Sequence, residues 1–214
     1  MAPEVAEVEA LYPYVDGSEF RGLTIREQVK QQAETLLAAH ADGDSRVSMQ
    51  IMSWWPEAIG RDVAGILASP FSKTDALLTI SREYGFKTWE AIDALGSKMS
   101  DPEFETALDK MLSGDAQSLG DMLKQNPALV SQQSDYGHKA TLLHYLGANG
   151  VESHRQRTPL NAVELAVLLL EHGADRSAEA DMYGGGQTPL ALASTSAHPV
   201  KAGVSEALNT VLAA

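Results

Sequence analysis

Short apolar stripes recur along the sequence from residue 103, and this recurrence limits the folds that the chain can adopt. Leu108, Met111 and Leu112 stand at positions i, i+3 and i+4, and residues 119–123 repeat that spacing. The spacing is typical of a helix with one buried face. A helix pair of this length cannot bury its apolar faces alone, so successive pairs are expected to stack on one another.

Two further helix pairs are predicted downstream. "TLLHYLGANG" (141–150) indicates a short helix capped by Thr141, and "NAVELAVLLLEHGAD" (161–175) indicates its longer mate, with Asn161 as cap and Gly173 as the terminating glycine. "TPLALAS" (188–194) and a last helix near 204–213 make the third pair. Strand signals are scarce, so we predict an all-α protein.

These segments resemble the ankyrin repeat, whose units read roughly Gly-x-Thr-Pro-Leu-His, a short helix, a longer helix ending in Leu-Leu-Leu-x-x-Gly-Ala-Asp, and a turn. "TLLH" departs only at Leu142, "LLLEHGAD" (168–175) is a close match, and "TPLA" (188–191) lacks the histidine. The resemblance covers residues 103–214, with "MLSGDAQSLGDMLKQNP" (111–127) as a degenerate first unit. It implies a short solenoid of three units, in which His144 hydrogen-bonds Thr141 and nearby backbone rather than serving catalysis.

The interhelix turns are longer than this family needs. Thr141 and Thr188 are 188 − 141 = 47 positions apart, whereas the family period is about 33 residues. The surplus lies in the turn 150–161 and the loop 180–187, and the last unit also has a long turn at 194–205. Stacking is expected to bring the interhelix turns 150–161 and 194–205 side by side. There they would either bind an anionic or amide-rich group or simply remain solvated. The candidate binding residues of these turns are Asn149, Glu152, His154, Arg155, Arg157, Thr195, Ser196 and His198.

Two tyrosines add to this candidate set. Tyr183 begins "YGGGQTP" (183–189), which lacks the Lys and Ser/Thr pair of a phosphate-binding loop. Its glycines are expected to allow tight turns with positive φ. Tyr183 would be either an exposed contact anchor or a side chain tucked between units. Tyr145 is expected on the concave face of the solenoid.

The N-terminal half is predicted to be helical and to divide into an acidic arm (1–20) and a capping region (21–102). The arm carries five acids and no base, which indicates a loosely held, solvated segment. Helices are expected at 24–41 and 72–85, and Pro56 should break the apolar stretch 47–68. Trp54, Trp55, Phe86 and Trp89 would cover an end of the solenoid. "ALLTISREYGFKTWEAI" (76–92) resembles a segment found ahead of ankyrin-like units in bacterial proteins of unassigned role.

Composition excludes several classes of function. The chain has 29 acidic and 16 basic residues, a formal net charge of −13, so nucleic acid and anionic membranes are not expected partners. It has no cysteine, no membrane-length apolar run and no secretory signal, which favours a cytoplasmic location. No nucleophile elbow or zinc-binding helix is present, so no cofactor, metal or catalytic residue is assigned. A His–carboxylate pair such as His198 or His154 with Glu152 stays open.

The leading expectation for function is therefore an ankyrin-repeat module that binds a protein through its concave face and loop edges. The alternative is a small-molecule binder or enzyme with a polar pocket where the turns 150–161 and 194–205 meet. A third possibility is a structural or immunity-type partner that acts through its acidic surface.

Overall fold

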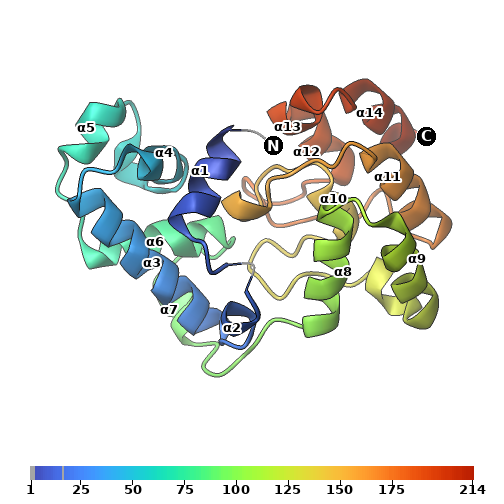
Figure 1. Cartoon of the computed structure of the whole chain (residues 1–214), viewed down its shortest axis with the longest axis horizontal. Helices are drawn as coiled ribbons and strands as arrows, with labels where there is room; N and C mark the ends of the chain where they lie inside the picture. Colours follow the sequence, from blue (N-terminus) through green and yellow to red (C-terminus); the bar gives the residue numbers. More distant parts are fainter. Residues whose placement is uncertain (1–2, 16) are drawn as a thin grey trace. The chain divides into compact units, whose positions relative to one another are not determined.

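The protein is all-helical in its computed structural model, which describes residues 3–15 and 17–214 (Figure 1). Among these residues no strand forms, and the β-type pairing is an isolated antiparallel bridge between Ala180 and Gln187. The chain divides into two compact units, residues 3–100 and 101–214. The sequence-based division placed this boundary at 102/103.

The described residues of the first unit form seven α-helices and two 3₁₀ helices. They are α1 Pro3–Leu11, α2 Ser18–Arg21, α3 Ile25–Ala41, η1 Ser45–Val47, α4 Ser48–Trp54, η2 Pro56–Ala58, α5 Val63–Leu67, α6 Lys73–Glu83 and α7 Trp89–Asp93. Helices α3 and α4 both pack against α6. Thr24 and Ser72 form the capping boxes that begin α3 and α6, within the two ranges where helices were predicted, and the expected break occurs at Pro56.

The acidic segment 1–20 is not a solvated arm in its described part, so that prediction is wrong. Residues 1–2 and 16 lie outside the described residues. Helix α1 and the turn after it bury Val8, Leu11 and Val15 within the first unit. The Tyr12 side chain is also buried, and its hydroxyl donates to Gln50 Oε1 at 2.6 Å. The acids of α1 accompany an apolar face, and burial of that face holds the segment in place.

Trp55 also belongs to the core of its own unit. Its ring is buried, packs edge-to-face on Phe71 with the ring centroids 5.2 Å apart, and donates from Nε1 to Asp75 at 3.2 Å. The Trp55 side chain therefore contributes to the hydrophobic core of the unit 3–100.

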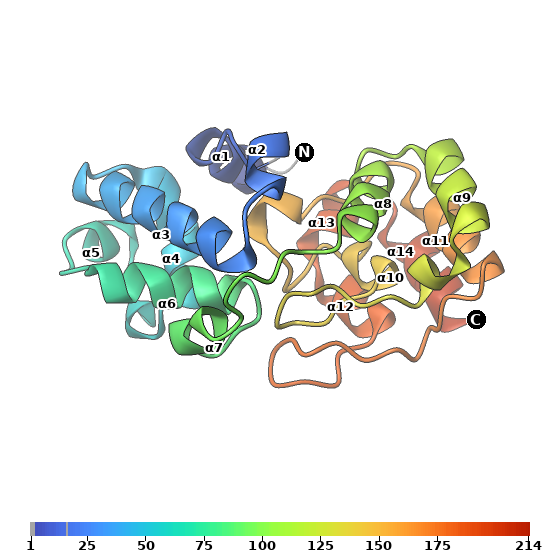
Figure 2. The same ribbon diagram turned by 90° about the horizontal axis from the view of Figure 1, so that it is seen from below.

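The second unit contains the helix pairs expected from the apolar stripes. Its elements are α8 Pro102–Leu112, α9 Ala116–Gln125, η3 Pro127–Val130, α10 Leu142–Tyr145, η4 Ser153–Arg155, α11 Ala162–Glu171, α12 Pro189–Thr195, α13 Ala197–Lys201 and α14 Ser205–Ala213. Helix α10 packs between α8 and α12, and α11 packs between α9 and α14 (Figure 2). Consecutive pairs therefore lie side by side within this unit.

The apolar stripes of the three pairs meet in one core, which is the physical reason that such short helices persist. The principal buried side chains are Phe104, Leu108, Met111, Leu119, Leu123, Leu142, Leu143, Leu146, Leu165, Leu169, Leu192, Leu208 and Leu212.

His144 has the structural role that was predicted for it. The Thr141 backbone N–H donates to His144 Nδ1 at 3.1 Å, so Nδ1 is an acceptor and the ring proton resides on Nε2. Nε2 then donates to the carbonyls of Ala178 and Gln187, at 3.0 and 3.1 Å. Burial lowers the pKa of His144, which keeps the ring neutral. The histidine thus ties α10 to the loop that precedes α12.

The long turns contain more structure than expected. The turn 150–161 includes η4, and the turn 194–205 includes α13, whose N-cap is Ser196. Asn161 stands at the N-cap of α11 but its side chain does not cap that helix. Instead Asn161 Nδ2 donates to the Gly114 carbonyl at 3.0 Å, which links α11 to the preceding pair.

Candidate functional site

The candidate residues of the second unit separate into two groups by burial. Tyr145, Glu152, His154 and Arg155 are buried, whereas Tyr183 is 64% exposed. We call the first group, together with Glu105 and His138, the buried cluster. We call Asn149, Tyr183 and Thr195 the loop edge.

The buried cluster is centred on one carboxylate. Glu152 Oε1 accepts from the Tyr145 hydroxyl at 3.3 Å and lies 3.5 Å from His138 Nε2 and 3.7 Å from Arg155 Nη1. Arg155 Nη2 in turn donates to Glu105 Oε2 on α8. Residues from α8, the loop before α10, α10 itself and η4 are thereby joined through charged and polar contacts inside the protein.

The electrostatics of the cluster follow from burial and from these neighbours. Burial opposes ionisation of Glu152, but the His138 ring and Arg155 outweigh it and lower the pKa of Glu152 to about 2. Burial raises the pKa of Glu105, and Arg155 offsets this only in part. Burial and the Arg155 cation lower the pKa of His154 to about 3. The cluster therefore combines an ionised Glu152 and Arg155 with a neutral His154.

The orientation of the His138 ring follows from its backbone contact. The Ala140 N–H donates to His138 Nδ1 at 3.1 Å, which turns Nε2 toward Glu152. His138 and Glu152 are both fully buried. Because bulk solvent does not reach them in this conformation, the pair acts as an internal contact between two segments of the chain. Within the described residues, five atoms of the cluster have no hydrogen-bond partner: Glu105 Oε1, His138 Nε2, Glu152 Oε2, Arg155 Nε and Arg155 Nη1.

Sequence reasoning missed Glu105 and His138. Glu105 resembled an ordinary first-turn acid of α8, and His138 lies in a polar link that resembled a solvated loop. One signal was present: Glu105 stands three positions before Leu108 and seven before Leu112, which places a charge inside an apolar stripe. A charge at such a position requires a buried partner of opposite sign.

The loop edge is a chain of hydrogen bonds near the surface. The Tyr183 hydroxyl donates to Asn149 Oδ1 at 2.6 Å. Asn149 Nδ2 donates to Thr195 Oγ1 at 3.0 Å and to the Leu192 carbonyl at 3.3 Å. The three side chains come from the segment after α10, the loop 180–187 and the end of α12, so the loop edge joins the residue before the turn 150–161 to the start of the turn 194–205.

Backbone strain is concentrated at this edge. Ala148 and Tyr183 have φ of 46° and 51°, in the left-handed region that non-glycine residues seldom occupy. Gly150, with φ of 73°, allows Tyr183 to approach, because a Cβ there would lie 3.0 Å from Tyr183 Cε2. Gly184, Gly185 and Gly186 have the positive φ that was predicted for the loop.

The remaining candidates have lesser or different roles. Tyr145 is fully buried, so the prediction that it lines an exposed concave face is wrong. Ser196 is buried and donates to the Ala148 carbonyl at 3.4 Å, and its Oγ accepts from the His198 N–H at 3.2 Å. Arg157 is half-buried and donates from Nε to the His154 carbonyl at 3.1 Å.

No family model, curated protein or solved structure matches this chain. Within residues 3–15 and 17–214, no three His, Cys, Asp or Glu side chains are grouped so as to hold a metal ion. Over the same residues, no helix has the length and apolar character required to cross a membrane. The geometry of the loop edge and of the buried cluster is therefore the basis for a functional proposal.

Proposed function

We propose that residues 101–214 form an ankyrin-like repeat module that binds a protein partner through the loop edge. The observation that carries this proposal is the exposure of Tyr183 in a strained, hydrogen-bonded conformation. Among the exposed large hydrophobic side chains of the described residues, Tyr183 is the aromatic one. An exposed aromatic ring with a fixed orientation supplies a large contact area at low entropic cost.

The preceding contacts explain why the ring is held in place before any partner arrives. Asn149 fixes the Tyr183 hydroxyl and is itself fixed by Thr195 and the end of α12. The partner would therefore not have to order this side chain on binding, which preserves affinity. The acidic net charge of the chain favours a partner with a basic surface.

A photo-crosslinking experiment tests this proposal. A benzophenone amino acid would be placed at Tyr183 in the full chain and, as a control, at Ile59, which is 84% exposed in the other unit. In extract of the native cell we expect one discrete protein adduct at Tyr183 and none at Ile59. Purified partner should then bind the Tyr183→Ala variant at least about tenfold more weakly, as for an aromatic hot spot, and bind Ile59→Ala unchanged. Identical adduct patterns at both positions would refute the proposal.

A second candidate function is a polar small-molecule site beneath the turn 150–161. The observation that favours it is the group of buried polar atoms without hydrogen-bond partners on Glu105, Glu152 and Arg155. A thermal-shift screen of anionic and amide metabolites tests it, since a ligand that binds only the folded state raises Tm. Stabilisation that disappears in Glu105→Gln, with Tyr183→Ala still responsive, would support this candidate over the loop edge.

A further inference from the structure

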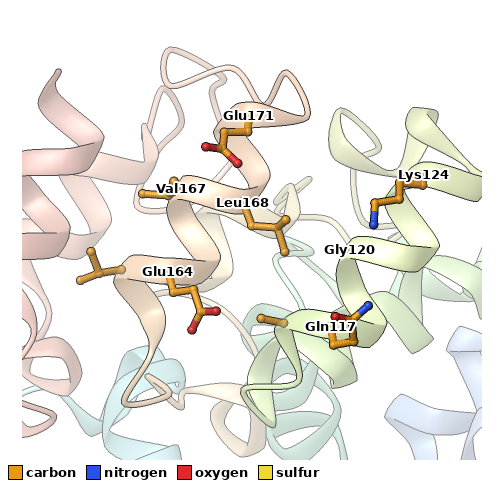
Figure 3. A pocket seen from close by; sticks show the side chains of 9 residues that line it. Gln117, Gly120, Lys124, Glu164, Val167, Leu168 and Glu171 are labelled. Atoms are coloured by element: carbon orange, nitrogen blue, oxygen red, sulfur yellow. The ribbon is translucent and has the colours of Figure 1, made fainter.

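A groove runs between α9 and α11 on the second unit, away from the residues of the buried cluster and the loop edge. Its volume is about 660 Å³. Figure 3 shows Leu168 of α11 pointing toward α9, with Gly120 facing it. Lys124 and Gln117 of α9 and Glu164 and Glu171 of α11 form the polar rim. The apolar floor consists of Ala116, Gly120, Val163, Val167 and Leu168.

The glycine on this floor is not required by packing within the chain. Gly120 lies in the interior of α9, where glycine destabilises a helix relative to alanine. A methyl group at this position would lie 3.6 Å from Leu168 Cδ1, an ordinary van der Waals distance. Alanine would therefore fit and would strengthen the helix. Gly120 is buried, and its missing methyl group leaves room beside Leu168 at the base of the groove.

The rim of the groove is acidic. Lys124 is already paired with Asp121 at 3.3 Å. Glu164 accepts a hydrogen bond from Asn161 at 3.2 Å, and neither Glu164 nor Glu171 has an ion-pair partner among the described residues. Two carboxylates beside a partly exposed apolar floor favour an occupant that brings both apolar and basic side chains. A second copy of this chain, with a net charge of −13, is disfavoured by like-charge repulsion.

The spacing of the carboxylates favours a helical occupant. Glu164 and Glu171 are seven positions apart on α11, which corresponds to about 10.5 Å along the helix axis. A partner helix presents residues i and i+7 on one face with the same rise. An extended strand presents same-face residues at spacings of about 6.8 or 13.6 Å. Neither spacing matches the rise of about 10.5 Å between the two carboxylates.

We propose that the groove between α9 and α11 binds an amphipathic helix of a basic partner protein. Two Lys or Arg residues seven positions apart pair with Glu164 and Glu171, and apolar side chains between them occupy the floor over Gly120 and Leu168. This assignment extends the proposed protein-binding function to a second surface. It uses no loop-edge residue, so the two proposals succeed or fail separately.

A pair of synthetic helical peptides tests the proposal on the full chain. The matched peptide of 16 residues carries lysines at peptide positions 5 and 12 and leucines at positions 8 and 9. The control peptide has the same composition with the second lysine at position 10, on another face of the helix. Fluorescence anisotropy should show at least about tenfold tighter binding of the matched peptide, because general attraction to an acidic protein is equal for both. Equal affinities would overturn the proposal.

Variants of the protein locate the binding. Glu164→Gln combined with Glu171→Gln should weaken the matched peptide about fivefold or more, whereas Glu179→Gln combined with Glu206→Gln, two exposed acids outside the groove, should not. Gly120→Ala should raise Tm by about 2–4 °C, because alanine stabilises the helix. The same change should weaken binding of the matched peptide severalfold, because the added methyl group takes up space that the peptide would occupy. Unchanged affinity in Gly120→Ala would overturn the proposal. So would concentration-dependent dimerisation that Gly120→Ala abolishes.

Discussion

Asn149 and Glu152 are three positions apart in the sequence, yet the structure uses them in opposite ways. Asn149 is half-buried and hydrogen-bonds Tyr183 and Thr195, whereas Glu152 is fully buried and receives contacts from Tyr145, His138 and Arg155. The comparison teaches that polarity and loop length alone do not mark a contact surface. Part of a long polar turn can be the interior of the protein.

The buried cluster and the loop edge should differ most in how far removal of their contacts lowers the free energy of unfolding. A charge removed from a buried cluster leaves its partners desolvated and uncompensated, whereas an exposed hydrogen bond is replaced by water. Both regions belong to residues 101–214, and all three tryptophans lie in residues 3–100. Hydrogen exchange of peptides from 101–214 is therefore the measurement that reports on this comparison.

The largest effect is expected for Arg155→Met. This change leaves Glu105 and Glu152 buried without their cation, so the free energy of unfolding should fall by about 3–5 kcal/mol. Arg176→Met, on an exposed arginine of the same unit, should cost less than about 1 kcal/mol. Adding Glu105→Gln to Arg155→Met should recover part of the loss, because one uncompensated carboxylate is removed. Strict additivity of the two changes would show that the cluster does not act as a unit.

The next effect concerns pH. His154 has a pKa of about 3 in the folded protein, against an unperturbed 6.5. Between these values the unfolded chain binds one more proton than the folded chain, so stability falls as pH falls, by up to about 1.4 kcal/mol per pH unit. The non-titrating variant His154→Gln should show a shallower slope by that amount between pH 6.5 and 5. Parallel slopes for the two proteins would mean that His154 takes up a proton in the folded state.

Tyr145→Phe tests the buried cluster by removing a single hydroxyl group. It removes the hydroxyl that donates to Glu152 and leaves the ring in the core. The free energy of unfolding should fall by about 1–2 kcal/mol, because a buried carboxylate loses a donor. The ring contact with His138, at 5.8 Å between centroids, should survive and can be followed by the His138 ring resonances in NMR. A neutral outcome would indicate that Arg155 and His138 alone satisfy Glu152.

The positions of helices were predictable where the determining interactions are local. Thr24 and Ser72 lie three residues from the acids that complete their capping boxes, and His144 lies three residues from Thr141. The burial of Glu152 was not predictable in this way. Its partners at positions 138, 145 and 155 are recognised only once the helix pairs are packed. For the same reason the acids of α1 suggested a solvated segment although its apolar face is buried.

The smallest effect on stability is expected for Tyr183→Phe, the counterpart of Tyr145→Phe at the loop edge. The hydrogen bond from Tyr183 to Asn149 is exposed, so water can replace it and the free energy of unfolding should change by less than about 0.5 kcal/mol. The ring would nevertheless lose its fixed orientation. We therefore expect the crosslinked partner to bind Tyr183→Phe severalfold more weakly than the unchanged chain, because the side chain must be ordered during binding. If Tyr183→Phe destabilised the protein as much as Tyr145→Phe, Tyr183 would be part of the core architecture and the distinction between the two regions would fail.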